Sequence, residues 1–178
     1  MSSLEVIATP LFGKKEHDWL VRLREVRAHN IGPPHFTLVF PGTDLAPNEF
    51  TRQVTAAASS VKRFPFRLCS ALVVPDLQVD SFHVFLVPDE GFGAIVRLHQ
   101  ALHAGTLGTR LREDFPYIPH LTVASERDFA AARTVAAKLN AQEFSIAGRI
   151  DELEIHRRDA DVVRCIAKVP LAKAGLFG

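Results

Sequence analysis

Hydrophobic residues recur along the first half of the chain with two different spacings, which predict helices and strands. Apolar residues three or four positions apart predict a helix that contains Trp19 and Val26 and ends before Gly32. The same spacing predicts a second helix from Pro47 to about Val61. Short runs rich in aromatic and β-branched residues, bounded by turn-forming residues, predict strands at 4–8, 35–40, 64–74 and 81–87.

The second half of the chain repeats this order of elements. Helical spacing recurs from Phe92 to Leu102 and from Phe129 to Leu139. Further strands are predicted at 120–124, 144–158 and 162–169. Self-similarity over this length indicates two lobes related by approximate two-fold symmetry. We therefore expect one domain, 1–178, with an internal repeat of approximately 1–88 and 89–178.

The composition is typical of a folded protein with little net charge. Of the 178 residues 47% are hydrophobic, including 13 Phe, which is enough for a real core. The formal net charge is only +1, so no global positive field would hold a long nucleic acid. We expect a monomer that binds neither DNA nor a membrane, with any polyanionic ligand small or held at one place.

The N-terminus and the cysteines add expectations about the compartment. Residues 1–11 lack a basic leader and a sustained apolar run, and no stretch reaches the length of a membrane span. Cys69 and Cys165 lie far apart and belong to no close cysteine pair, which favours two reduced, buried thiols. We expect a cytoplasmic protein without a cofactor or a bound metal.

One short motif occurs twice, at the same place in each half. Pro34-His35-Phe36-Thr37 and Pro119-His120-Leu121-Thr122 are offset by 85 residues. Because side chains alternate along a strand, the histidine and the threonine of each copy share one face, while their neighbours point into the core. A two-fold relation would turn both polar faces toward one cleft.

Two imidazoles on opposite sides of one group suit in-line displacement at phosphorus. One removes a proton from the attacking oxygen and the other gives a proton to the leaving oxygen, because histidine offers both forms near neutrality. Threonine hydroxyls can donate hydrogen bonds to the phosphoryl oxygens as their charge grows. A single His-x-Thr is usually a strand-edge histidine beside a β-favouring threonine, but two matched copies favour the catalytic interpretation.

These paired motifs, Pro-His-Phe-Thr-Leu-Val-Phe and Pro-His-Leu-Thr-Val, resemble those of the 2H phosphoesterase superfamily, and within it the 2′-5′ RNA ligase-like proteins. The resemblance implies an α+β, bilobal fold in which two antiparallel sheets line a central cleft. It implies 2′,3′-cyclic phosphodiesterase activity that leaves a 2′-phosphate, and in some members reversible 2′-5′ ligation. By the same match His35 and His120 would be acid and base, and Thr37 and Thr122 would bind the phosphate.

One position departs from the pattern of this family. Many RNA-directed members carry an arginine three residues after the second threonine, where this chain has Ser125. Arg127, two residues later, could take its place, but we interpret it as a solvated residue at a helix start. Tyr117 and Phe115 precede the second motif, where an aromatic ring could stack on a nucleobase or simply pack in the loop.

The remaining histidines carry weaker signals. His99 and His103 have the spacing of metal ligands on a helix, but without a third ligand we interpret them as histidines at the border of the core. His83 could line the cleft, although a packed or hydrogen-bonded histidine is the better interpretation. His156 reads as a surface residue, as do the arginines of Arg22-Leu-Arg24.

The sequence therefore predicts a metal-independent phosphodiesterase that acts on a small nucleotide or an RNA end carrying a 2′,3′-cyclic phosphate. Two alternatives stay open. One is a phosphodiesterase of a small cyclic phosphate that is not RNA, which Ser125 favours. The other is a nucleotide-binding module without turnover, although a pure binder has no need of two proton-transfer groups. The sequence does not assign acid and base between the two histidines.

Overall fold

Two antiparallel sheets and the helices that cover them form the protein. The computed structural model describes residues 2–25, 32–42, 45–76, 79–111, 116–160 and 162–173. The strands are β1 Ser2–Ala8, β2 Leu11–Phe12, β3 Phe36–Gly42, β4 Phe64–Pro75, β5 Phe82–Glu90, β6 Leu121–Glu126, β7 Ile146–Ile150, β8 Glu152–Asp159 and β9 Val162–Pro170. The helices are α1 Lys14–Glu25, α2 Pro47–Ser60, α3 Phe92–Leu102 and α4 Phe129–Ala141, with a 3₁₀ helix at Gly105–Arg110. The expected α+β class is confirmed.

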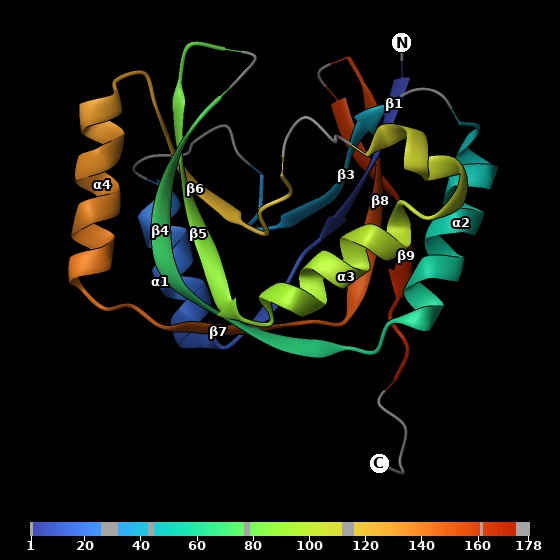
Figure 1. Ribbon diagram of the computed structural model, residues 1–178, viewed down its shortest axis with the longest axis horizontal. Helices are drawn as coiled ribbons and strands as arrows, with labels where there is room; N and C mark the ends of the chain where they lie inside the picture. Colours follow the sequence, from blue (N-terminus) through green and yellow to red (C-terminus); the bar gives the residue numbers. More distant parts are fainter. Residues whose placement is uncertain are drawn as a thin grey trace.

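Each sheet contains strands from both halves of the sequence. One sheet has the order β3-β1-β8-β9 and the other the order β2-β7-β4-β5-β6, and their strand pairs are antiparallel (Figure 1). The first motif leads into β3, and the second motif leads into β6, so each motif belongs to a different sheet. In both sheets the motif strand is an edge strand and lies beside the preceding strand of the same sheet, β1 for β3 and β5 for β6.

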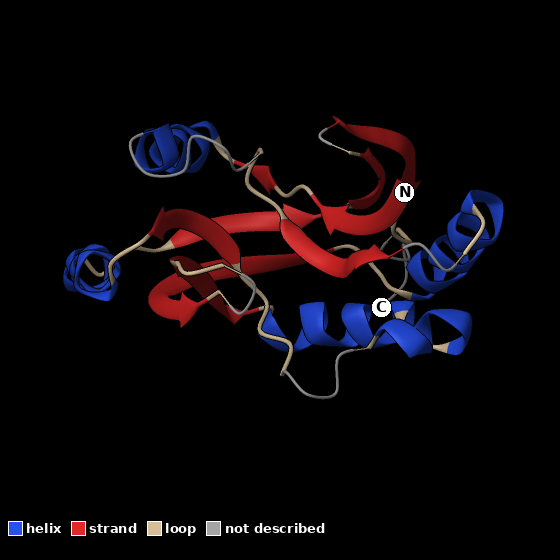
Figure 2. Ribbon diagram, turned by 90° about the horizontal axis from the view of Figure 1, so that it is seen from above, coloured by secondary structure: helices blue, strands red, loops and turns tan. Residues whose placement is uncertain are grey.

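The helices are divided between the two sheets. α2 packs against strands of the β3-containing sheet, and α1 and α4 pack against strands of the β6-containing sheet, while α3 contacts β3 of the first and β5 of the second. Seen from above, the strands occupy the middle of the molecule and the helices lie around them (Figure 2). Within the described ranges, no helix is long and apolar enough to cross a membrane.

The alternation predicted for the motif strands is confirmed. Phe36 and Leu38 are fully buried in the core, as are Leu121 and Val123. The side chains between them must therefore lie on the opposite face of each sheet. We call this the motif face, because it carries the histidine and threonine of each copy.

The single strand predicted at 144–158 is wrong. The chain passes from one sheet to the other at Asp151, so β7 and β8 are separate strands. The parity of the buried positions changes there, from Ile146 and Ile150 to Leu153 and Ile155. Because alternation has a period of two, that change of parity is the sequence signal of the crossing. The prediction also missed β2, which pairs with β7, and the 3₁₀ helix.

Candidate active site

Both motif histidines make the same hydrogen bond. Nδ1 of His35 lies 2.7 Å from the carbonyl oxygen of Pro33, and Nδ1 of His120 lies 2.6 Å from that of Ile118. A carbonyl oxygen can only accept, so Nδ1 must carry the proton in each ring. Nε2 is thereby left with the lone pair in the neutral form. Each imidazole can accept a proton at Nε2 or, once charged, donate one there.

The threonines take equivalent places in the two sheets. Thr37 pairs across the strands with Ile7 of β1, and Thr122 pairs with Phe85 of β5. Residues directly opposite one another in antiparallel strands share a face, so both threonines lie on the motif face beside an apolar neighbour. Both are partly exposed, so their hydroxyls can reach a ligand.

The two copies of the motif lie close together in space. A charge on His35 contributes to lowering the pKa of His120, although the two residues are far apart in the chain. The hydroxyl of Tyr117, just before the second motif, donates to the carbonyl oxygen of Thr37 at 3.1 Å. The expected meeting of the two motifs is therefore what the structure describes.

The two imidazoles differ in their surroundings. Burial lowers the pKa of His120 to about 4, and charges on His35 and His83 act in the same direction. The ring of Phe85 stacks on His120 with 3.6 Å between centroids and an interplanar angle of 13°. Burial also lowers the pKa of His35, and charges on Arg24 and His156 act in the same direction. The hydrogen bond to Pro33 and the carboxylate of Glu5 oppose this effect. The imidazolium form is therefore better supported at His35.

The motif face is polar in one sheet and apolar in the other. In the β3-containing sheet, Glu5 pairs with His156, and Ile7 pairs with Glu154. In the other sheet, Phe85 pairs with Leu72, which is 42% exposed. We call these the polar wall (Glu5, Glu154, His156) and the apolar wall (Leu72, Phe85).

The prediction that His156 and Arg24 are surface residues is wrong. His156 is not a surface residue, because its side chain is only 17% exposed and its Nε2 lies 2.8 Å from Glu154 Oε2. A charge on His156 lowers the pKa of His35. Arg24 is buried and donates to the carbonyl oxygen of Gly32. Its charge lowers the pKa of His35. His156 could have been found by alternation, because it shares a face with Glu154 opposite Leu153 and Ile155.

His83 and His99 make the contacts of packed or hydrogen-bonded histidines. His83 Nε2 lies 2.9 Å from Asp76 Oδ2, and its charge acts on the pKa of His120. His99 is buried behind the first motif, and its Nδ1 donates to the carbonyl oxygen of Leu38 at 2.7 Å. His103 is buried as well and donates to the carbonyl oxygen of His99 at 2.8 Å.

The structure gives Tyr117 a packing role. Its ring stacks on His99 with 3.7 Å between centroids and an interplanar angle of 4°, so one face is already covered. Its hydroxyl is engaged with Thr37, as described above. Phe115, the other residue considered for stacking, lies outside the described residues.

The position of the missing family arginine is occupied by an exposed side chain. Ser125 lies in β6 and pairs across the strands with His83 of β5. Arg127 is exposed, directly before Asp128, whose carboxylate caps α4 by accepting from the backbone N–H of Ala131 at 2.9 Å. Arg127 is therefore a residue at a helix start, as expected.

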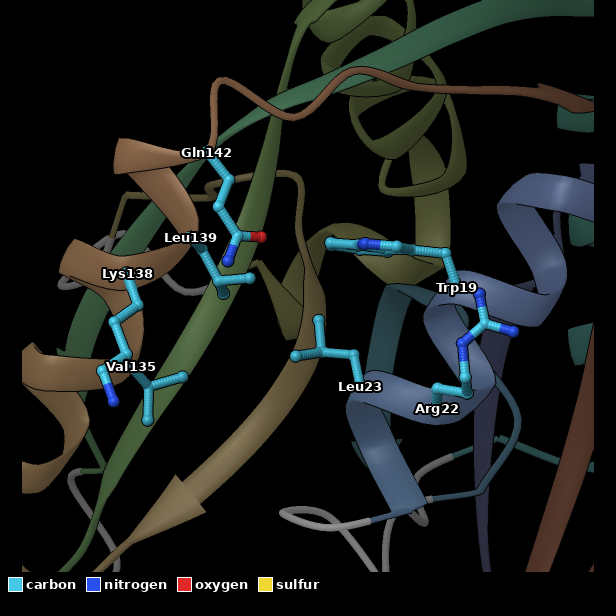
Figure 3. A pocket seen from close by; sticks show the side chains of 7 residues that line it. All are labelled: Trp19, Arg22, Leu23, Val135, Lys138, Leu139 and Gln142. Atoms are coloured by element: carbon cyan, nitrogen blue, oxygen red, sulfur yellow. The ribbon is translucent and has the colours of Figure 1, made fainter.

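A cavity of about 330 Å³ lies away from both motifs. It opens between α1 and α4, where Trp19 and Leu23 face Val135 and Leu139 (Figure 3). Arg22, Lys138 and Gln142 complete its lining, and none of the residues of either motif contributes to it. Because it lacks any proton-transfer group of the motifs, we place the candidate site on the motif face.

Comparison with known proteins adds a family and a fold. The model of the 2′-5′ RNA ligase superfamily matches residues 16–162. A search of curated proteins found no match. The structure resembles Usb1 of Kluyveromyces marxianus with uridine monophosphate, at a TM-score of 0.60 and 12% identity, covering 95% of this chain and 98% of that chain. It also resembles LigT of E. coli in its apo form, at a TM-score of 0.56 and 14% identity, covering 97% and 99%. At these identities the likeness establishes a shared fold.

Proposed function

The chain belongs to the 2′-5′ RNA ligase superfamily, and from this premise we propose that it hydrolyses 2′,3′-cyclic phosphates to 2′-phosphates without a metal. Membership of this superfamily supports phosphoesterase-type chemistry. The finer assignment, a cyclic phosphate on an RNA end or a small nucleotide, is our inference from the residues of the motif face. Joining a 2′-5′ linkage would be the same displacement with a 5′-hydroxyl in place of water.

One observation carries the proposal. The Nδ1 atoms of His35 and His120 both donate to the carbonyl two residues earlier, which leaves both Nε2 atoms for proton transfer. A histidine with only a packing role would not need a second histidine that makes the same Nδ1 hydrogen bond. Thr37 and Thr122, two residues further on, supply a hydroxyl beside each imidazole.

The reaction needs one base and one acid. Water attacks phosphorus and gives its proton to one Nε2, and the P–O3′ bond breaks as the other Nε2 protonates the departing oxygen. The pKa of both histidines is lowered. We assign the base to His120, whose pKa is about 4, and the acid to His35, where the carboxylate of Glu5 favours the charged form. Thr37 and Thr122 donate to the non-bridging oxygens as their charge grows. In ligation a 5′-hydroxyl replaces water and the two histidines keep these roles, which they exchange when a 2′-5′ linkage is cleaved.

The residues of the motif face limit the classes of substrate that fit the site. The apolar wall offers the exposed Leu72 to a nucleobase. The solved Usb1 and LigT structures include complexes with uridine monophosphate and 3′-AMP. A small cyclic nucleotide fits these features. Exposed Ser125, where an arginine would help hold RNA, favours the small cyclic phosphate over an RNA end. We further propose that residues 1–178 form a single domain and a monomer.

The repeat within this domain follows from the strand order. We propose that β1 and β5 are equivalent, since each lies beside the motif strand that follows it. The two units would then begin at β1 and β5 and differ from the division at residue 89. Under this scheme β4 and β8, which each enter the sheet of the other unit, are also equivalent.

The proposal is tested by turnover in EDTA. Purified protein should open a 2′,3′-cyclic mononucleotide and yield the 2′-phosphate, which phosphorus NMR distinguishes from the 3′-product. A panel that adds oligonucleotides with a cyclic end and small non-RNA cyclic phosphates would rank the substrates. Turnover that depends on an added divalent metal would reject the mechanism, and tight nucleotide binding without turnover would establish the binding module instead.

A further inference from the structure

Three metal-ligating side chains converge on the polar wall. Glu154 and His156 of β8 and Cys165 of β9 each offer one ligand atom, and these atoms lie within 4.8 Å of one another. We propose that they form a binding site for a divalent ion of the zinc class, with the fourth position open to solvent or a ligand. This site shares no residue with the two motifs, and the hydrolysis proposed above does not use it.

The backbone places the three side chains on one face. Glu154 and His156 are two residues apart in β8, so they point the same way. His156 pairs with Cys165 across the strands, although Ile155 pairs with Ala167. The register shift between these pairs leaves Ile166 as an extra residue of β9. Without that bulge Ile166 would lie opposite His156, so the bulge is what brings the Cys165 thiol beside the imidazole.

The donor set matches what zinc prefers. Thiolate, imidazole and carboxylate are its usual protein ligands, and three of them with one open position is a common arrangement. His156 Nε2 and Glu154 Oε2 are 2.8 Å apart, and a small spreading would let both ligate one ion. The other oxygen, Glu154 Oε1, lies 3.2 Å from Lys168 Nζ, which orients the carboxylate as outer contacts of metal sites do.

The site is accessible and adjoins the first motif. The expectation of a buried Cys165 is wrong: the residue is exposed, and its thiol donates only a long contact of 3.5 Å to the carbonyl of Ala167. Cys69 is partly exposed. Because the charge on His156 acts on His35, an ion bound by His156 would add positive charge next to that histidine.

Cobalt(II) is the probe that tests the site, because a cobalt–thiolate bond gives a charge-transfer band in the near ultraviolet. Untagged, reduced wild-type protein should show this band, saturating at one cobalt per chain, and zinc should abolish it stoichiometrically. Cys165→Ser should lack the band, whereas Cys69→Ser, the matched control, should keep it. Glu154→Gln and His156→Ala should each weaken binding by at least about tenfold.

The outcomes are decisive in both directions. Absence of a saturable band in the wild type, a band that survives in Cys165→Ser, or one that is lost in Cys69→Ser would overturn the site. Circular dichroism of each variant checks that the fold is intact, and Glu154→Gln provides a second test that leaves both cysteines in place. Since no readout here is turnover, this result stands apart from the success or failure of the proposed hydrolysis.

Discussion

The hydroxyl of Tyr117 donates to the backbone carbonyl oxygen of Thr37, 3.1 Å away, and so joins the segment before the second motif to the strand of the first. The two residues are 80 positions apart in the chain. His99 stacks on the same tyrosine and donates to the next carbonyl, that of Leu38. These two hydrogen bonds, one part-buried and one buried, thereby fix the backbone of the first motif relative to the second.

Tyr117→Phe should remove this link while keeping the ring. We expect the free energy of unfolding to fall by about 1 kcal/mol, the usual value of one hydrogen bond. If the tyrosine positions the motifs, kcat should fall while KM stays near its wild-type value, because geometry in the transition state is lost. Thr55→Ala, which removes an exposed helix contact on α2, is the control and should leave kcat unchanged. A purely structural role would lower stability and leave kcat intact.

The threonine hydroxyls are predicted to stabilise charge in the transition state. Thr37→Ala or Thr122→Ala should lower kcat by about 10²-fold or more, the typical cost of one lost donor. Thr→Ser at the same positions keeps the hydroxyl and should retain most of the activity. Steady-state kinetics on a 2′,3′-cyclic nucleotide would measure both pairs. Equal losses in the alanine and serine variants would mean that the methyl group, and not the hydroxyl, is what matters.

The stacked Phe85 is predicted to set the acidic limb of the pH profile. Since the pKa of His120 is about 4 and that of His35 lies below 6.5, kcat/KM should be greatest between these values. It should fall below about 4, as the base becomes protonated, and at higher pH, as the acid loses its proton. Phe85→Leu exposes His120 more, so its acidic limb should move to higher pH. Phe82→Leu, whose partner Phe129 lies outside the motifs, should not move it.

Buried histidines should make the fold sensitive to acid. The pKa of His99 is lowered to about 4, mainly by burial, whereas an unfolded histidine titrates near 6.5. Between these values the unfolded chain binds more protons, so the free energy of unfolding should fall as the pH drops from about 6.5 toward 4. His99→Asn keeps a donor to Leu38 without a titrating ring and should flatten this dependence. Urea unfolding at pH 7 and pH 5 measures the slope, and an unchanged slope would exclude His99 as a cause.

The motif residues were predictable because their signal is local. Proline, histidine, alternation and burial lie within a few residues of one another, and the identical hydrogen bonds to Pro33 and Ile118 follow from the same short segment. The polar wall was predictable only in part: alternation places Glu154 and His156 on one face, but Glu5 joins them only when β1 pairs with β8 across most of the chain. Strand partners are chosen by non-local packing, which a period of two in one segment does not encode.

The crossing of the chain from one sheet to the other at Asp151 was less predictable than the motifs and more predictable than the polar wall. The change in parity of the buried positions is present in the sequence, but two apolar runs with one polar residue between them also fit a single long strand. β7 lies between β2 and β4, and there the Phe66 ring lies beside Gly148. A side chain at position 148 would collide with that ring, with its Cβ only 2.5 Å from Phe66 Cζ.

The central claim is that His35 and His120 act together on one phosphate, and substitution of each tests it most directly. With a 2′,3′-cyclic nucleotide in EDTA, His35→Ala and His120→Ala should each lower kcat/KM by at least about 10²-fold, and the double variant should lose little more than either single one. His17→Ala, at an exposed position on α1, should be fully active, and all variants should unfold cooperatively like the wild type. Near wild-type turnover in either motif variant would contradict the account.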